Sequence, residues 1–480
     1  MSNNPDKNQE LWMDRDILTR HCLGIAATGG GKSNFLNLQL KQQMMRGGGC
    51  IHIDGKNSKE AIIEFLNLAR IHDRWHDVRI INIDDAELSN TYNPLLRGDA
   101  DELTARIMAM IPEKGGENFF RSQAATALRA ITGVLRAIDL PVNFDDLLTL
   151  MKSESAMRWL VQNGPKDSRE YEQFLGWYNN MQEVDRRTGV NIVNEKKIQH
   201  SFGDLIGRLN PYNAGTAAQV LNAYNPEVDL YQAMQENLLV YVALPMLSKN
   251  EIATNFAKLF ISDLRTAIGQ IQNDKVKPAP TFSVFMDEFS SYAMPSLAPV
   301  FEQARSANVS LFPFVQTVSS LKDKERGLSE DFANKILGNT WSKISFVLKD
   351  PESCEVMSKI AGEQRTQSVS ESVGEQISFS SGGDRDSTSM VRTGGRGRGY
   401  TKSISYDYEA IVRPEDFANL DTQKGEAIYI GKSEVLKLRV PYVQVPMLEY
   451  ESDEEALDFP RFKMSHRRGL AIVDVSQYKS

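Results

Sequence analysis

The chain has 480 residues, of which 41% are hydrophobic, so it is long enough for two or three domains with a substantial core. Its formal net charge of −8 argues against a chain that binds nucleic acid over its whole surface, but it leaves room for a local basic pore or loop. The three cysteines have no paired spacing, which excludes a metal knuckle and suits a reducing compartment. The polar N-terminus does not resemble a signal peptide, and no apolar run reaches the roughly 18 residues of a membrane span.

The most informative segment is AATGGGKS, residues 26–33, which reads as a phosphate-binding P-loop. Its glycines allow consecutive backbone N–H groups to wrap an anion, Lys32 is suited to reach the β- and γ-phosphates, and Ser33 is suited to hold Mg²⁺. The motif usually begins with glycine, where this chain has Ala26. The alternative is a glycine-rich turn that happens to precede Lys-Ser. The predicted nucleotide-binding residues are Ala27, Thr28, Gly29, Gly30, Gly31, Lys32 and Ser33.

The flanking sequence favours the P-loop because it predicts a buried strand before it and a helix after it. This order places bound phosphates at a helix N-terminus, where free N–H groups and the helix dipole favour anions. Further strands and helices alternate beyond it. The predicted elements are a strand at 21–27, a helix at 32–46, a strand at 50–54, a helix at about 58–70 and a strand at 78–83.

The alternation of strand and helix stops near residue 100 and resumes at Leu238, which predicts a discontinuous α/β domain with a mostly parallel sheet. The residues between carry helical patterns and few β-branched runs, which is typical of an inserted all-α domain. The predicted division is a first part of the nucleotide-binding domain at 1–100, the all-α insertion at 101–232, a second part at 233–445 and an acidic C-terminal tail at 446–480.

Two segments of biased composition each allow two interpretations. Residues 366–402 are rich in serine and glycine with interspersed arginine, which favours a flexible surface loop. The alternative is a basic loop that contacts nucleic acid or a neighbouring subunit. The acidic run Glu449–Asp458 is expected to be solvated, or to serve as a docking peptide.

A second chemical motif follows the apolar strand 282–286, which ends in Asp287 and Glu288. In P-loop hydrolases such a strand delivers an aspartate to the Mg²⁺ shell, and an adjacent glutamate polarises the attacking water. An acid after a buried strand is common, but its combination with a P-loop is specific. The pair assigns metal binding to Ser33 and Asp287 and the role of general base to Glu288, and it excludes simple GTPases.

Two further residues follow in chain order. Gln316 ends the strand 309–315, where an amide beside the P-loop senses a γ-phosphate or caps a loop. Arg305 precedes that strand; it is either an ordinary surface residue or an arginine that completes the site of a neighbouring subunit and stabilises transition-state charge. The predicted catalytic residues are therefore Lys32, Glu288, Arg305 and Gln316.

The region around these residues resembles the type IV coupling proteins, the hexameric ATPases of conjugation and type IV secretion. The similarity rests on MDEFSSYAMPSLAPVFEQARSANVSLFPFVQT, the AATGGGKS loop, GCIHIDGKNS, the Tyr92–Leu95 segment YNPL and NKILGNTWSKISFVLKDP. It extends over roughly residues 15–100 and 235–445. The segment IDGK, residues 53–56, is most similar to TraG/TraD relatives of conjugative and Dot/Icm-like systems, among them the TrbC, IcmO and DotL types.

The resemblance implies a RecA-like motor core that uses ATP and Mg²⁺, an all-α domain facing the bacterial cytoplasm, and a hexamer. It implies a channel for single-stranded DNA or secreted proteins at the cytoplasmic face of the inner membrane, with secretion-channel components and adaptors as partners. Position by position, it gives Arg305 the role of the trans arginine and Gln316 that of the sensor. The membrane helices usual in the family are not found, so we expect either a fragment or a member that partners hold at the membrane.

Two other functions remain open at the level of sequence. A DNA translocase of the FtsK/HerA kind would show DNA-stimulated ATPase activity without any secretion partner. In a non-motor receptor, nucleotide would only lock the assembly, and ATP turnover would be almost zero. The Asp287–Glu288 pair argues against such a receptor, whereas the acidic tail mildly supports it.

Overall fold

A nine-stranded sheet forms the centre of the molecule, in the order β13-β12-β9-β1-β8-β7-β2-β6-β3. The computed structural model describes residues 10–111, 118–184, 187, 189, 191–380, 393–432, 434–446 and 448–461. Seven of the strands, from β9 to β3 in this order, run parallel to one another. At the other end of the sheet, β12 pairs antiparallel with both β9 and β13. This confirms the predicted α/β class. The strands are β1 (Cys22–Ile25), β2 (Cys50–Asp54), β3 (Val78–Asn82), β6 (Leu239–Ala243), β7 (Phe282–Met286), β8 (Val309–Val315), β9 (Ser342–Ser345), β12 (Glu426–Ile430) and β13 (Val435–Arg439).

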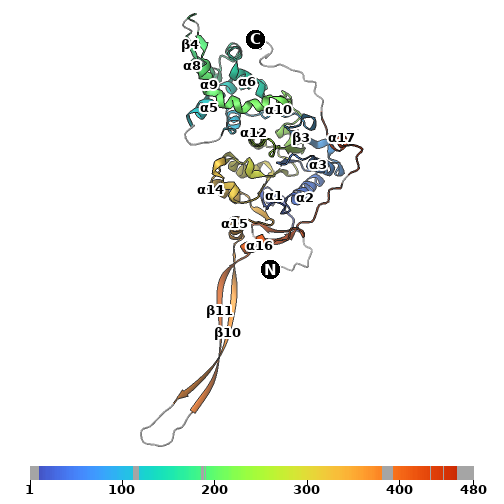
Figure 1. The fold of residues 1–480 in the computed structure, drawn as a ribbon, viewed down its shortest axis with the longest axis vertical. Helices are drawn as coiled ribbons and strands as arrows, with labels where there is room; N and C mark the ends of the chain where they lie inside the picture. Colours follow the sequence, from blue (N-terminus) through green and yellow to red (C-terminus); the bar gives the residue numbers. More distant parts are fainter. Residues whose placement is uncertain are drawn as a thin grey trace.

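Helices cover both faces of this sheet, as a parallel sheet requires (Figure 1). Successive strand residues point to opposite faces, so in β2 Cys50 joins one apolar cluster while Ile51 and Ile53 join the other. The cluster of Cys50 includes α2 (Lys32–Met45) and α3 (Lys59–Ile71). The opposite cluster includes α12 (Asn250–Asp274), α13 (Ala298–Gln303), α14 (Glu330–Asn339) and α15 (Pro351–Ala361).

A mainly helical region lies beyond one edge of the sheet, at the top of Figure 1. Within the range predicted to be all-α, it also contains a small antiparallel sheet of β4 (Gln182–Val184) and β5 (Asn191–Val193). Among the described residues, we find no helix that is long and apolar enough to cross a membrane. The exact domain boundaries remain predictions. The helices are α4 (Ala100–Met108), α5 (Asn118–Ala137), α6 (Phe144–Lys152), α7 (Glu154–Asn163), α8 (Arg169–Asn180), α9 (Glu195–Leu209), α10 (Gly215–Leu221) and α11 (Leu230–Gln235).

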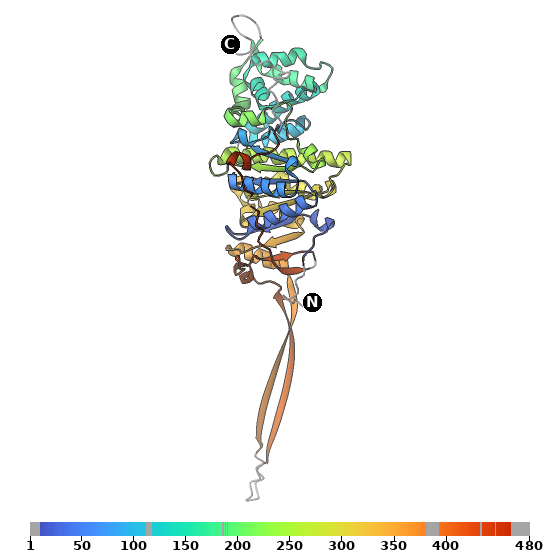
Figure 2. The ribbon, with the colours of Figure 1, turned by 90° about the vertical axis from the view of Figure 1, so that its right-hand side faces the viewer.

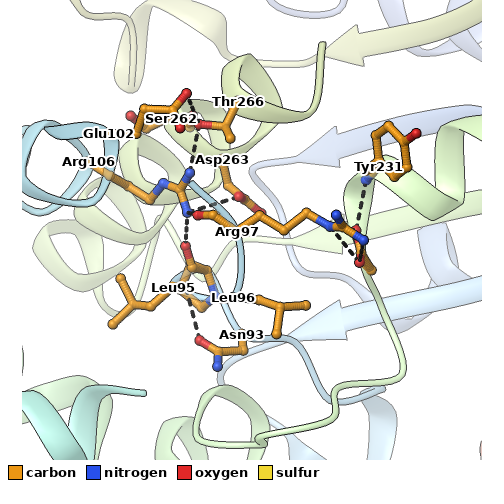
Figure 3. A network of polar contacts seen from close by, with 12 residues as sticks. Asn93, Leu95, Leu96, Arg97, Glu102, Arg106, Tyr231, Ser262, Asp263 and Thr266 are labelled. Atoms are coloured by element: carbon orange, nitrogen blue, oxygen red, sulfur yellow. Dashed lines mark hydrogen bonds and ion pairs between the residues drawn. The ribbon is translucent and has the colours of Figure 1, made fainter. Parts of the chain in front are cut away.

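A buried ionic network joins this helical region to the core (Figure 3). The guanidinium of Arg106 on α4 is fully buried and lies 2.9 Å from a carboxylate oxygen of Asp263 on α12. Tyr92 donates a hydrogen bond of 2.7 Å to the other oxygen of that carboxylate. Burial raises the pKa of Asp263 to about 6, although Arg106 and Tyr92 oppose the shift. The network therefore joins α4, near the point where the chain leaves the core, to α12, which lies in the core.

The segment 366–402, expected to be a flexible loop, instead belongs to a long antiparallel hairpin. Strands β10 (Glu363–Ser380) and β11 (Thr393–Ala410) pair from Glu363 with Ala410 to Ser380 with Thr393, and they project away from the sheet (Figures 1 and 2). The prediction was wrong because it weighed composition and overlooked that serine and threonine recur at every second position of TQSVSES, the period of a strand. The remainder of the predicted loop, 381–392, lies outside the described residues.

The acidic C-terminal run is only partly as predicted. Its carboxylates are exposed, but Leu457 and Phe459 are buried in the cluster of α2 and α3. Arg70 of α3 donates hydrogen bonds to the carbonyls of Ala456 and Asp458, at 3.0 and 2.7 Å. The run, with α17 (Asp453–Ala456), therefore lies against the core, because Arg70 binds its backbone carbonyls and two of its apolar side chains are buried. The short helices α1 (Arg15–Leu18) and α16 (Pro414–Ala418) complete the fold.

The buried pair predicts a large effect on stability. Asp263→Ala is expected to lower the free energy of unfolding by about 3–5 kcal/mol, because it leaves the charge of Arg106 buried without its carboxylate. Thermal melting at pH 8, above the pKa of Asp263, measures this loss. Arg129→Ala is the matched control, since it breaks an exposed pair with Asp101 and is expected to cost less than about 1 kcal/mol. Equal losses in the two variants would contradict this account of the junction.

Candidate phosphate-binding site

The P-loop begins where β1 ends, in the middle of the sheet. The N–H group of Ala26 donates to the carbonyl of Val315 on one side, at 3.1 Å, and that of Ala27 donates to Val347 on the other, at 3.0 Å. The end of β8 and the segment that follows β9 (Ser342–Ser345) thus hold the start of the loop, which turns through residues 28–31 into α2. Ala26 is buried, so the residue that departs from the usual glycine packs into the core instead of disturbing the turn.

Three glycines suit the shape of this turn, and Gly29 is one of them, with φ of 73°. Gly31 has φ of 102°, a conformation that side chains with a β-carbon rarely adopt. A β-carbon on Gly30 would lie 2.8 Å from the carbonyl oxygen of Ala27, which is too close. Gly31 is also the N-cap of α2 and makes no side-chain hydrogen bond to the helix. Gly31 has no side chain that could cap the first N–H groups of α2, and uncapped N–H groups at a helix start favour an anion.

Lys32 meets both acidic residues that follow β7. Its ammonium lies 2.5 Å from a carboxylate oxygen of Asp287 and 3.2 Å from one of Glu288. Only 12% of the lysine side chain is exposed. Burial disfavours the ammonium, but the charges and hydrogen bonds of Asp287 and then Glu288 outweigh it, so the pKa of Lys32 is raised above its ordinary value. Residues separated by more than 250 positions thus form one cluster at the carboxyl edge of the sheet.

The backbone after β7 is bent so that Glu288 faces this cluster. Glu288 has φ of 52°, a left-handed conformation that costs a non-glycine residue about 1 kcal/mol or more. Its N–H group donates to the carboxylate of Asp287 at 2.8 Å, and Tyr292 donates to the carbonyl of Asp287 at 2.7 Å. The side-chain amide of Gln316 donates to both carboxylate oxygens of Glu288, each at 3.1 Å. Gln316 therefore touches Glu288 from the end of the adjacent strand β8.

The oxygen donors at this edge suit Mg²⁺, which prefers one or two protein oxygens and keeps several waters. Ser33, in the first turn of α2, has an exposed hydroxyl-bearing side chain, whereas Asp287 is buried. Among the described residues, no group of three or more histidine, cysteine or acidic side chains forms a ready-made metal cage. Such a site would need phosphate oxygens and water to complete the shell of the ion.

Asp54 is a further acidic residue at this edge that the sequence analysis did not assign to the site. It ends β2, the neighbour of β7, and accepts a hydrogen bond of 2.8 Å from Tyr241. Burial, followed by the charge of Asp54, raises the pKa of Tyr241 well above its usual range. The sequence signal was present, since Asp54 ends an apolar strand as Asp287 does, but IDGK served only as part of the resemblance.

Arg305 does not join this cluster within the chain. It lies in a turn of 3-10 helix (Ala304–Ala307) before β8, whereas the P-loop follows the carboxyl end of β1. Since β1 and β8 are parallel, Arg305 lies at the amino ends of the strands and the P-loop at their carboxyl ends. The guanidinium of Arg305 pairs with Asp16 at 2.8 Å, and 49% of its side chain is exposed. It is accessible to a neighbouring molecule, but not to Lys32 of the same chain.

Known proteins match this chain in sequence and in fold. A family model described as the TraM recognition site of TraD and TraG matches residues 281–422. The type 4 coupling protein DotL of Legionella pneumophila is 24% identical over 488 residues, in an alignment that covers 92% of this chain. The chain spans only 59% of the length of that relative.

Solved structures of the coupling protein TrwB share the fold. Its unbound form, a bacterial conjugative coupling protein, superposes with a TM-score of 0.60 at 16% identity, covering 90% of this chain and 87% of that one. TrwB in complex with ADP and Mg²⁺ gives a TM-score of 0.59 at 16% identity, with the same 90% and 87% coverage.

These matches support the type IV coupling protein family. They confirm the resemblance that the DEF region and the P-loop indicated. They also confirm the fold class, since the sheet is mostly parallel and superposes on TrwB.

The strained glycine of the loop gives a direct test of phosphate binding. Gly31→Ala is expected to weaken binding of inorganic pyrophosphate on the order of tenfold, because relief of about 1–2 kcal/mol of backbone strain would turn the loop N–H groups away. Isothermal titration calorimetry measures the affinity. Gly47→Ala is the control, since it places comparable left-handed strain (φ of 72°) at the far end of α2 in open space. Unchanged binding by Gly31→Ala would contradict the cradle.

Proposed function

We propose that the chain is the ATPase of a type IV coupling protein, a motor that recruits substrates and feeds them to a secretion or conjugation channel. The observation that carries this proposal is the contact of Lys32 with Asp287 and Glu288 beside the glycine turn. That arrangement joins a phosphate cradle, a metal-binding carboxylate and a candidate base at one sheet edge, which is where open parallel sheets bind ligands.

The residues present fit an ATP and Mg²⁺ site. Ser33 and Asp287 would hold Mg²⁺, which neutralises phosphate charge when bound. The raised pKa keeps Lys32 cationic, so it would bind the β- and γ-phosphates. Glu288 would accept a proton from, and orient, the attacking water, and Gln316 would position Glu288 and sense the γ-phosphate. TrwB, which shares the fold, has been solved with an ATP analogue and with ADP and Mg²⁺, which supports this ligand choice.

The active assembly in this proposal is a homo-oligomer, a hexamer by analogy with the family. Arg305 would complete the site of the next subunit, which is supported by its exposure and its position at the opposite sheet edge. The cargo would be relaxase-bound single-stranded DNA, protein effectors or both, handed to channel components at the cytoplasmic face of the inner membrane. Similarity to DotL, a type 4 coupling protein, and to TrwB, a conjugative coupling protein, supports a role of this class.

Two substitutions separate binding from hydrolysis. Lys32→Ala is expected to abolish ATP turnover because the phosphates lose their cation. Glu288→Gln is expected to keep ATP binding while turnover falls roughly 10²–10⁴-fold, because an amide cannot accept the proton. Phosphate release and calorimetry with ATP and Mg²⁺ measure the two properties. Lys59→Ala, an exposed lysine on α3, controls for loss of positive charge. Parent-level turnover by Lys32→Ala would refute the ATPase assignment.

Mixed oligomers test the shared site. Arg305→Ala alone is expected to bind ATP but not hydrolyse it, since its own Lys32 site is intact. Mixing it with Lys32→Ala protein is expected to restore part of the turnover, because some interfaces then hold both wild-type residues. Asp16→Ala, which removes the partner of Arg305 within the chain, is expected to remain active. If Asp16→Ala is as inactive as Arg305→Ala, or if mixing restores nothing, Arg305 serves the fold of its own chain instead.

A further inference from the structure

A segment from the far end of the chain is fastened to the first turn of α2. The side-chain amide of Asn34 donates to the carbonyl of Pro441 at 2.9 Å, and its oxygen accepts from the N–H group of Val443 at 2.7 Å. Asn34 follows Ser33 of the P-loop directly. One side chain therefore holds two backbone groups that are more than 400 residues away in sequence against the mouth of the phosphate cradle.

Tyr442 lies between these two anchored residues, and 83% of it is exposed. The hydrogen bonds of Asn34 hold the backbone on either side, so the backbone of Tyr442 is fixed beside α2 while its ring is open to solvent. The fold thus presents an aromatic ring at a defined place beside α2 without burying it. Because the ring is exposed, it adds little to the stability of the hydrophobic core and is free to contact a ligand.

The order of the strands gives the direction in which a nucleotide would lie. The acidic residues that contact Lys32 follow β7, which lies beyond β8 on one side of β1, whereas β9, β12 and β13 lie on the other side. Residues 441–443 follow β13 and belong to that second side. A nucleotide with its terminal phosphate near Glu288 would therefore extend its ribose and base away from β7, toward the segment that Asn34 holds.

We propose that Tyr442 is the platform on which the base of the bound nucleotide stacks. The inference rests on the proposed function and assigns to it the base-binding part of the site. A tyrosine ring offers a flat apolar face at low conformational cost, and stacking needs no hydrogen-bond code. Asn34 is then a positioning residue, which ties the stacking surface to the helix that holds the phosphates.

Paired ligands with and without a base test this role. Calorimetry on the full chain compares ADP with inorganic pyrophosphate, each with Mg²⁺. Tyr442→Ala is expected to weaken ADP binding roughly five- to fiftyfold, the range for loss of one stacked base, while pyrophosphate affinity stays within about twofold. Tyr442→Phe keeps the ring and is expected to bind ADP nearly as the parent does. Tyr408→Ala, another exposed tyrosine, is the control and is expected to change neither affinity.

Each other outcome is informative. If Tyr442→Ala binds ADP as the parent does, the base lies elsewhere and the platform is refuted, while the ATPase proposal stands. An equal loss of ADP and pyrophosphate affinity would show that the segment merely supports the loop, which also refutes the platform. If the parent protein binds neither ligand, the proposed function itself fails and the inference falls with it.

Discussion

The ion pair between Lys32 and Asp287 is the contact on which the whole site depends. It joins the start of α2 to the end of β7, two elements that only the completed parallel sheet brings together. An amine and two carboxylates in this partly buried position stabilise one another, because each would otherwise lose hydration without compensation. The same pair also sets the cost of ligand entry, since phosphate must replace the carboxylates around the lysine. A metal ion held by Asp287 would offset that exchange.

The rest of the molecule extends from this edge in separate directions. The helical region is tied to α12 through the buried Arg106–Asp263 pair. The hairpin of β10 and β11 projects from the opposite end of the sheet (Figure 2). Between them, the C-terminal segment runs from Asn34 at the P-loop to Arg70 on α3. The C-terminal segment therefore connects the nucleotide site to α3 on the face of the sheet that α2 and α3 cover.

Sequence patterns predicted those parts of the structure that local chemistry determines. The apolar strand before the glycines, the helix from Lys32 and the strand ending in Asp287 each carry their own signal, and parallel packing then brings them together. The hairpin was missed because its serine-rich composition masked a period of two. The contacts of Asn34 with residues 441–443 had no signal at all, since a hydrogen bond to a distant backbone leaves no pattern in the sequence. The left-handed backbone of Glu288 was equally unforeseeable, because tertiary packing imposes it.

The most direct test of the central claim is a crystal or cryo-electron-microscopy structure of the full chain with Mg²⁺ and a non-hydrolysable ATP analogue. We expect phosphates over the turn at Gly31, Lys32 turned from Asp287 to the β- and γ-phosphates, and the metal between Ser33 and Asp287. A nucleotide bound elsewhere, with the lysine still paired to its carboxylates, would contradict this expectation.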